Sequence, residues 1–187
     1  MKTLSRSASA FTLIELLAVI GIIACLAGLL MPSIISVRQK ADSIRCVSNL
    51  RQIAASSLLY ANDHSQHLPL IEPWLDKPLY APSDNAQTML QALQNYGVTP
   101  SILKCPTDVN GPNYYAKEGS SYQWSVVASG QSTQSVKFVF MGFQTPALPM
   151  SQVILAFDYT AVHNNGTNVV FGDGHMGVSN LPPSNAQ

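Results

Sequence analysis

Four side chains near the C-terminus could ligate a metal ion, namely Asp158, His163, Asp173 and His175. Calcium takes about six to eight oxygen ligands, and imidazole nitrogens suit other metals better, so this mixed set is a weak match to calcium. We therefore expect structural roles, in which Asp173 organises a turn and His163 makes a hydrogen bond across a hairpin. A metal ion held by these four residues is the alternative, and no other cofactor is expected.

A second chemical feature is one carboxylate, Glu15, within an apolar run at residues 11–32 (FTLIELLAVIGIIACLAGLLMP). A helix over residues 11–31 would cover roughly the 30 Å hydrocarbon core of a bilayer. We therefore expect this segment to cross a membrane once. A charged side chain in lipid is costly unless it is paired or reaches the interface, so Glu15 indicates one of these two situations.

Several export signals compete for this segment. The A-x-A at residues 8–10 precedes the apolar run, which argues against an ordinary cleaved secretory signal. Residues 22–25 (IIAC) resemble a lipobox in which Cys25 would be acylated, but apolar residues continue as far as Met31. A plain signal anchor would leave Glu15 as an unexplained cost of about 2.5–3.5 kcal/mol at mid-membrane.

Residues 10–15 (AFTLIE), followed by the apolar run, resemble the prepilin-type cleavage and methylation motif of type IV pilins and type II secretion pseudopilins. The resemblance implies that a prepilin peptidase at the bacterial inner membrane cuts between Ala10 and Phe11 and methylates the amine of Phe11. The residue before the cut is normally Gly in this family, so Ala10 is a departure that bears on cleavage efficiency. Pro32 stands where many members carry a helix-breaking proline.

The resemblance also implies assembly roles for Glu15 and Pro32. In the family's filaments this Glu is thought to face the N-terminal amine of a neighbouring subunit, an attraction that a low-dielectric bundle strengthens. Glu15 would then select the axial register of the subunits, whereas a Glu at the membrane edge needs no partner. Pro32 removes a backbone hydrogen bond and should kink or locally unwind the helix, and residues 24–32 are the stretch that we expect to unwind in a filament.

Charge is distributed unevenly along the chain, although its formal net charge is zero. Residues 1–60 contain six Lys or Arg and two acidic residues, whereas residues 61–187 contain four Lys and eight acidic residues. Phosphate binding needs clustered cations, so the acidic second part argues against nucleic acid as a partner. Only 11% of the residues are charged, against about 25% in a typical soluble domain. This composition fits a secreted or surface-displayed protein.

The elements that must position these residues form four segments. We expect a cytoplasmic leader (1–10), a membrane-spanning assembly helix (11–31), an amphipathic stalk helix (32–63) and a periplasmic head (64–187). Apolar residues of the stalk recur at helical spacing in two adjoining stripes, one through Val37 and Ile44 and one through Cys46, Leu50 and Ile53. One face of the stalk should pack on the head, and the other should face water or neighbouring subunits.

The head is predicted to be α+β and pilin-like, with a small antiparallel sheet laid on the long N-terminal helix. A short helix is expected at residues 85–96, with Ser83 or Asp84 as its cap and Gly97 as its end. Short aromatic and β-branched runs separated by turn residues predict strands. They lie at residues 122–127, 136–143, 153–158, 168–171 and 175–178.

Three cysteines fit an exported head. Cys46 on the stalk and Cys105 in a loop would both lie in the oxidising periplasm, so we predict a disulfide between them, with two free thiols as the alternative. Cys25 lies in the apolar run.

His163, Asp173 and Gly174 resemble the H-x9-DG motif at the C-terminus of a large group of prepilin-type proteins. A related major pseudopilin holds calcium in a C-terminal loop, so the resemblance also leaves calcium conceivable here. The spacing brackets one turn and one strand, but sequence alone does not show whether His163 and Asp173 meet.

These patterns favour a structural subunit rather than an enzyme, because no nucleophile elbow, zinc-protease motif or phosphate-binding glycine loop is present. The resemblance implies a subunit of a type II secretion pseudopilus or, second, of a type IV pilus. Its partners would be the prepilin peptidase, the inner-membrane assembly platform, membrane lipid and sister subunits in a homo- or hetero-oligomeric filament, in the periplasm or at the cell surface. The alternative is a membrane-anchored periplasmic binding module whose His/Asp end holds a metal ion or ligand.

Overall fold

The computed structural model describes residues 12–71, 87–108, 113–137, 139–140, 143–144, 146–159 and 166–179. The expected leader, Ala10, Phe11 and His163 lie outside these residues, as do Ser83 and Asp84. The chain divides into two compact units, Met1–Lys40 and Ala41–Gln187. The second unit therefore begins inside the predicted stalk helix rather than after it.

Helix α1 (Leu13–Asp63) begins in the first unit and ends in the second. In the first unit its large apolar side chains are exposed, among them Leu13, Leu17 and Ile23 at 59–81%. The helix continues through Pro32 in the single chain. The unwinding expected at residues 24–32 concerns the filament and stays a prediction. Among the helices of the described ranges, none has the length and apolar character needed to cross a membrane, and the span expected at residues 11–31 is not confirmed.

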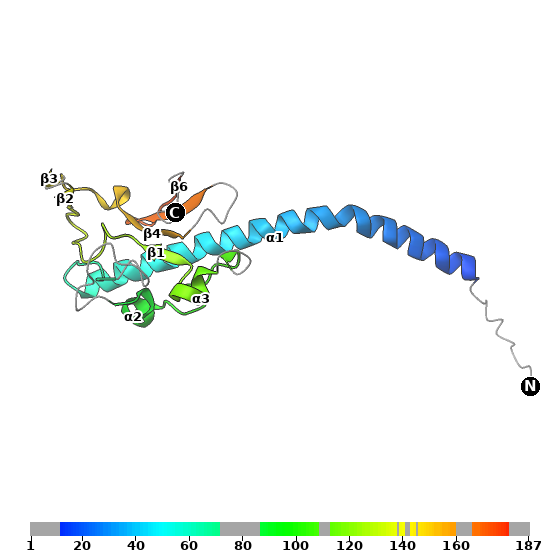
Figure 1. Cartoon of the computed structure of the whole chain (residues 1–187), viewed down its shortest axis with the longest axis horizontal. Helices are drawn as coiled ribbons and strands as arrows, with labels where there is room; N and C mark the ends of the chain where they lie inside the picture. Colours follow the sequence, from blue (N-terminus) through cyan, green and yellow to red (C-terminus); the bar gives the residue numbers. More distant parts are fainter. Residues whose placement is uncertain are drawn as a thin grey trace, which may run out of the picture. The chain divides into compact units, whose positions relative to one another are not determined.

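In the second unit α1 is the central element of the head, and Figure 1 shows strands β1 and β4 beside its cyan C-terminal half. Both predicted stripes contribute buried residues there, because Ala54 and Ala61, which continue the stripe through Val37 and Ile44, are at most 1% exposed. Cys46, Leu50 and Ile53 are fully buried, whereas Ile44 is 69% exposed. Periodicity identified the amphipathic helix correctly, but the stripe through Val37 and Ile44 is buried only in its later part, at Ala54 and Ala61.

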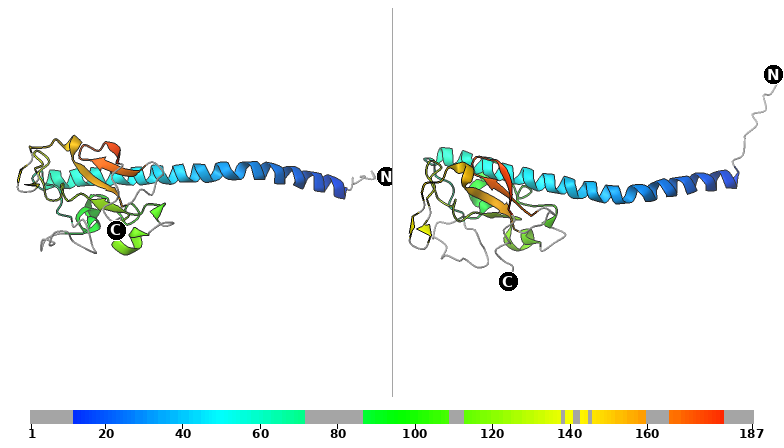
Figure 2. Two further views of the ribbon diagram at one scale, coloured as in Figure 1. Left: turned by 45° about the horizontal axis from the view of Figure 1, so that its top comes forward. Right: turned by 90° about the horizontal axis from the view of Figure 1, so that it is seen from above.

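The main sheet has four antiparallel strands in the order β1-β4-β5-β6. They are β1 (Tyr122–Trp124), β4 (Ile154–Asp158), β5 (Thr167–Phe171) and β6 (Met176–Ser179). Tyr122 pairs with Asp158 at one end of the sheet, and Ile154 pairs with Phe171 at the other. The register along β4 shifts between Ile154 and Ala156. Figure 2 shows these strands over the C-terminal half of α1 from two further directions. The α+β pilin-like layout is confirmed.

The smaller elements differ from expectation in detail. The helix predicted at residues 85–96 is α2 (Met89–Leu93) followed by the 3-10 helix η1 (Gln94–Tyr96), and its cap is Thr88, which forms a capping box with Gln91. Gly97 ends η1 in the left-handed conformation at φ +96°, which glycine adopts without strain. The remaining helices are α3 (Tyr114–Glu118) and the 3-10 helix η3 (Met150–Gln152).

The strand predicted at residues 136–143 is not one strand of the main sheet. It is replaced by a separate two-stranded pair, β2 (Val139–Phe140) with β3 (Phe143–Gln144). Val136 instead forms an isolated bridge with Leu148. A run of β-forming residues predicts extended backbone, but the partner strand depends on tertiary contacts that the run does not encode.

The structure contains the disulfide between Cys46 of α1 and Cys105, whose Cα atoms lie 5.3 Å apart. Both residues are at most 1% exposed and belong to the main hydrophobic core with Leu50, Leu103 and Trp124. The link therefore fastens the loop after residue 103 to the helix on which the head is built. Cys25 is free and exposed.

Removal of this disulfide should lower the stability of the head. The cross-link spans 59 residues of sequence, and the loss of loop entropy in the unfolded chain corresponds to about 4 kcal/mol. We expect the double variant Cys46→Ser/Cys105→Ser to unfold at a clearly lower urea concentration under non-reducing conditions. Cys25→Ser is the matched control and should unfold as the wild type does. An unchanged midpoint in the double variant would contradict the stabilising role.

Candidate assembly site and C-terminal turn

The N-terminal end of α1 is closed by a reciprocal contact between Thr12 and Glu15. Glu15 Oε2 accepts hydrogen bonds from the Thr12 backbone N at 2.9 Å and from Thr12 Oγ1 at 2.8 Å, and Thr12 Oγ1 accepts from the Glu15 backbone N at 3.4 Å. This is a capping box, which satisfies amide donors that have no partner inside the helix. Both residues are exposed.

Sequence analysis missed this role of Thr12, although the spacing T-x-x-E in front of an apolar run is a signal for it. The structure thus gives Glu15 a local function that needs no second subunit. It also leaves the carboxylate exposed at the start of α1, where a neighbouring chain could reach it. The two functions make different demands, because a capping box works with Glu or Gln, whereas pairing with an amine needs a negative charge.

The Asp-Gly pair of the C-terminal motif forms the turn between β5 and β6. Asp173 Oδ1 accepts a hydrogen bond from the backbone N of His175 at 3.0 Å and also contacts His175 Nδ1. These hydrogen bonds from the backbone and side chain of His175 hold the pKa of Asp173 below its usual value. Gly174 has φ +86°, a conformation that favours glycine.

Gly172 precedes this turn and is required for a different reason. A Cβ atom at this position would lie 2.8 Å from the backbone oxygen of Met150 in η3, closer than two such atoms can approach. The Gly172 backbone N donates to the carbonyl oxygen of Val153 at 2.8 Å. The turn is therefore fixed against the start of β4.

At the opposite end of β4, Asp158 is a buried carboxylate that is only 1% exposed. Its Oδ2 accepts hydrogen bonds from Asn168 Nδ2 at 2.7 Å and from the Asn168 backbone N at 3.2 Å. Burial raises the pKa of Asp158 to about 7, against the opposing effect of the Asn168 hydrogen bonds, and the charge of nearby Asp108 adds a smaller rise. Asp158 therefore fastens β4 to β5.

Asp108 is a second buried carboxylate, and sequence analysis did not single it out. It is 2% exposed and accepts hydrogen bonds from the backbone N of Tyr114, the backbone N of Tyr115 and Ser121 Oγ. It thereby ties the start of α3 to the residue before β1. The signal that could have found it is an Asp a few residues ahead of a short helix.

The structure does not bring together the three proposed metal ligands that it describes, Asp158, Asp173 and His175. Asp158 lies at the end of β4, whereas Asp173 and His175 lie at the turn after β5, which runs antiparallel to β4, so the two groups are at opposite ends of the sheet. Over the part of the chain that the structure describes, no group of three or more His, Cys, Asp or Glu residues could hold a metal ion. His64 and His67 each contact a nearby backbone carbonyl oxygen. Asp173 organises its turn, as expected.

Comparison with known proteins relates the chain to a secretion apparatus. Residues 5–31 match the family described as "Prokaryotic N-terminal methylation motif". The chain is 32% identical over 104 residues to the type II secretion system core protein G of Klebsiella pneumoniae, covering 56% of this chain and 70% of that protein.

Two further relatives carry the same description. The protein of Escherichia coli K12 is 31% identical over 104 residues, which cover 56% of this chain and 68% of that protein. The protein of Klebsiella michiganensis is 28% identical over 127 residues, which cover 67% of this chain and 85% of that protein. No solved structure gives a significant match.

The raised pKa of Asp158 predicts that its contribution to stability depends on pH. The unfolded carboxyl ionises near 3.8 and the folded one near 7, so stability should fall as pH rises between these values and then level off. Asp158→Asn keeps an acceptor for Asn168 but does not titrate. Urea unfolding from pH 4 to 8 should show the wild type losing up to about 4 kcal/mol relative to this variant.

Asp173→Asn is the control for this measurement. Because the pKa of Asp173 is lowered, the stability that its carboxylate contributes is present above its ordinary pKa and is lost as pH falls. This pH dependence has the opposite sign to that of Asp158. Parallel pH profiles for the wild type and Asp158→Asn would contradict the assignment to Asp158.

Proposed function

Because this chain belongs to the family of the type II secretion system core protein G, we propose that it is a structural subunit of a type II secretion pseudopilus. The observation that carries the proposal is the match of residues 5–31 to the methylation motif, together with about 30% identity to core protein G over most of that protein's length. Pseudopilins are building blocks rather than enzymes, and we assign this chain no catalytic role. It is a pseudopilin rather than an adhesive or motility pilin.

The proposed maturation begins at the N-terminus. Prepilin peptidase would cut between Ala10 and Phe11 and methylate the amine of Phe11, and the inner-membrane assembly platform would add the subunit to the filament. We place the start of the mature chain at the inner membrane and the head in the periplasm. The exposed apolar side chains of α1 in the first unit support this placement, because such a surface needs lipid or neighbouring helices around it.

Glu15 would then exchange one partner for another during assembly. In the single chain its carboxylate accepts two hydrogen bonds from Thr12. In the filament we propose that it faces the methylated amine of Phe11 on an adjoining subunit, and that only the correct axial stagger provides this pairing. A low-dielectric environment makes an unpaired charge costly, so the pairing selects the register.

Charge and capping at Glu15 can be separated by substitution. Glu15→Gln keeps the capping box but removes the negative charge, and Thr12→Ala removes the capping hydroxyl but keeps the charge. If the charge selects the register, Glu15→Gln and Glu15→Leu should both be cleaved and methylated normally yet fail to enter filaments, whereas Thr12→Ala should assemble. Intact-mass analysis of the N-terminus reports processing, and sedimentation of sheared filaments reports assembly.

Filaments formed by Glu15→Gln at the wild-type level would contradict the charge role and leave capping as the function of Glu15. An uncut N-terminus, or an acylated Cys25, in the native protein would contradict the proposed function as a whole.

A further inference from the structure

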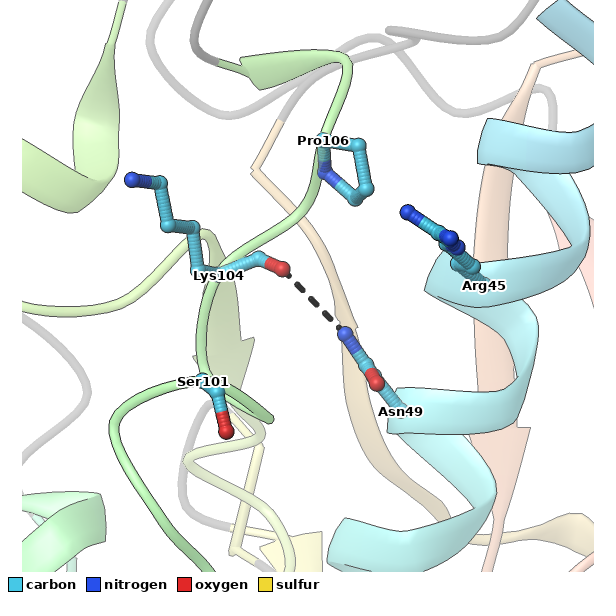
Figure 3. Close-up of a pocket in the computed structure, with 5 residues that line it drawn as sticks. All are labelled: Arg45, Asn49, Ser101, Lys104 and Pro106. Carbon is cyan, nitrogen blue, oxygen red and sulfur yellow. Dashed lines mark hydrogen bonds between the residues drawn. The ribbon is translucent and has the colours of Figure 1, made fainter. Parts of the chain in front are cut away.

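The head carries a basic pocket of about 330 Å³ at the junction of α1 and the loop around Cys105. Its lining residues are Arg45, Asn49, Ser101, Lys104 and Pro106. Figure 3 shows the Arg45 guanidinium directed toward Pro106 across the opening, with Asn49 below it. All five residues belong to the second compact unit, so the pocket is a feature of the head alone.

The walls of this pocket are fixed by the core beneath it. Asn49 Nδ2 donates hydrogen bonds to the backbone oxygen of Lys104 at 3.2 Å and to the hydroxyl of Tyr122 at 3.1 Å. The disulfide lies directly behind, because Cys46 follows Arg45, and Cys105 separates Lys104 from Pro106. The backbones that carry the two cations are therefore held together before any ligand arrives, which lowers the cost of binding.

The two cations of the pocket have no acidic partner within the head as described. Arg45 and Lys104 are both exposed, and neither forms an ion pair with a described residue. The Lys104 ammonium group instead lies 5.4 Å from the centre of the Tyr115 ring. An open pocket with an unpaired guanidinium suits a carboxylate, which arginine binds in a bidentate geometry.

A second copy of this chain offers such a carboxylate. Outside α1, Asp173 is the exposed carboxylate among the described side chains, whereas Asp108 and Asp158 are buried. The lowered pKa of Asp173 keeps it ionised at neutral pH. His175 binds Oδ1 of Asp173 and leaves Oδ2 without a hydrogen bond from His175.

The pocket and the Asp173 turn lie at opposite ends of the head. On the pocket side, Asn49 donates a hydrogen bond to Tyr122, and Tyr122 pairs with Asp158 at one end of β4. Asp173 lies near the other end of β4, because it follows Phe171, which pairs with Ile154. The two surfaces differ from each other and are separated along the head. They suit head-to-tail contacts, which generate open helical polymers.

We infer that the pocket around Arg45 receives the Asp173 turn of a second copy of this chain, and that this contact joins successive heads of the filament. This inference rests on the proposed function. It assigns the Asp-Gly part of the C-terminal motif to subunit recognition, beyond its structural role in the turn. The Lys104 ammonium group is directed away from Arg45 (Figure 3), so the Arg45 guanidinium is the cation that would meet the acidic partner.

Charge reversal within the full-length chain tests the pairing. Arg45→Glu and Asp173→Arg should each reduce sedimentable filaments by about tenfold or more, because like charges then meet at every contact between successive heads. The double variant Arg45→Glu/Asp173→Arg carries a reversed but complementary pair and should recover most of the assembly. Arg51→Glu is the matched control, since it makes the same change on an exposed residue of α1 outside the pocket, and it should assemble normally.

A second measurement tests the same contact without reversing any charge, so it does not require the head to fold with a reversed charge. A photo-crosslinking amino acid in place of Ser101, at the pocket edge, should capture the peptide that contains Asp173 from another copy. Mass analysis of the non-reduced chain should show the Cys46–Cys105 disulfide in every variant, which verifies that the head has folded.

The outcomes separate this inference from the proposed function. Normal assembly of Arg45→Glu, no recovery in the double variant, or capture of a different protein or a small anion by the pocket would overturn the pairing while the wild type still polymerises. Absence of any polymer from the wild type would overturn the proposed function and the pairing with it.

Discussion

The head of this protein depends on one packing contact, the burial of a face of α1 against the sheet and the loop of Cys105. Cys46, Leu50 and Ile53 are fully buried in this contact together with Trp124 and Leu155 from the sheet. A helix that forms the core of a small head cannot also be free to move within it. The consequence is that residues 41–63 are fixed within the head, so that a force acting on them is transmitted to the whole head.

This contact also explains the positions of the buried polar groups. Asp108 and Asp158 are both nearly inaccessible, yet their carboxylates accept hydrogen bonds from backbone amides and from Ser121 or Asn168. Buried carboxylates are tolerated when such donors surround them. The hydrogen bonds of Asp108 and Asp158 hold short strands and a short helix, which bury little apolar surface of their own. Polar contacts thus fix these elements in addition to the apolar core.

Much of this arrangement was predictable from the sequence, because the signals were local. The family motif at residues 10–15, the amphipathic helix, the C-terminal hairpin and the pairing of two exported cysteines each depend on a few residues and their spacing. The point along α1 at which burial begins was not predictable: Ile44 is more apolar than Cys46 or Ser57, yet it is 69% exposed and they are buried. Which residues of the helix pack inward depends on partners such as Tyr122, Trp124 and Cys105, which are distant in sequence. The partners of Asp158 and Asp108 were not predictable for the same reason, whereas the Thr12–Glu15 capping box was present in the sequence and overlooked.

The disulfide has a consequence for the timing of maturation. Cysteines pair in oxidising compartments and stay reduced in the cytosol, so under the proposed function a copy that has not yet been exported would lack this covalent link. Cys46 and Cys105 are buried once the head has closed, which shields the finished bond from later reduction. Under the proposed function, the closed disulfide would therefore distinguish an exported subunit from one that is still in the cytosol.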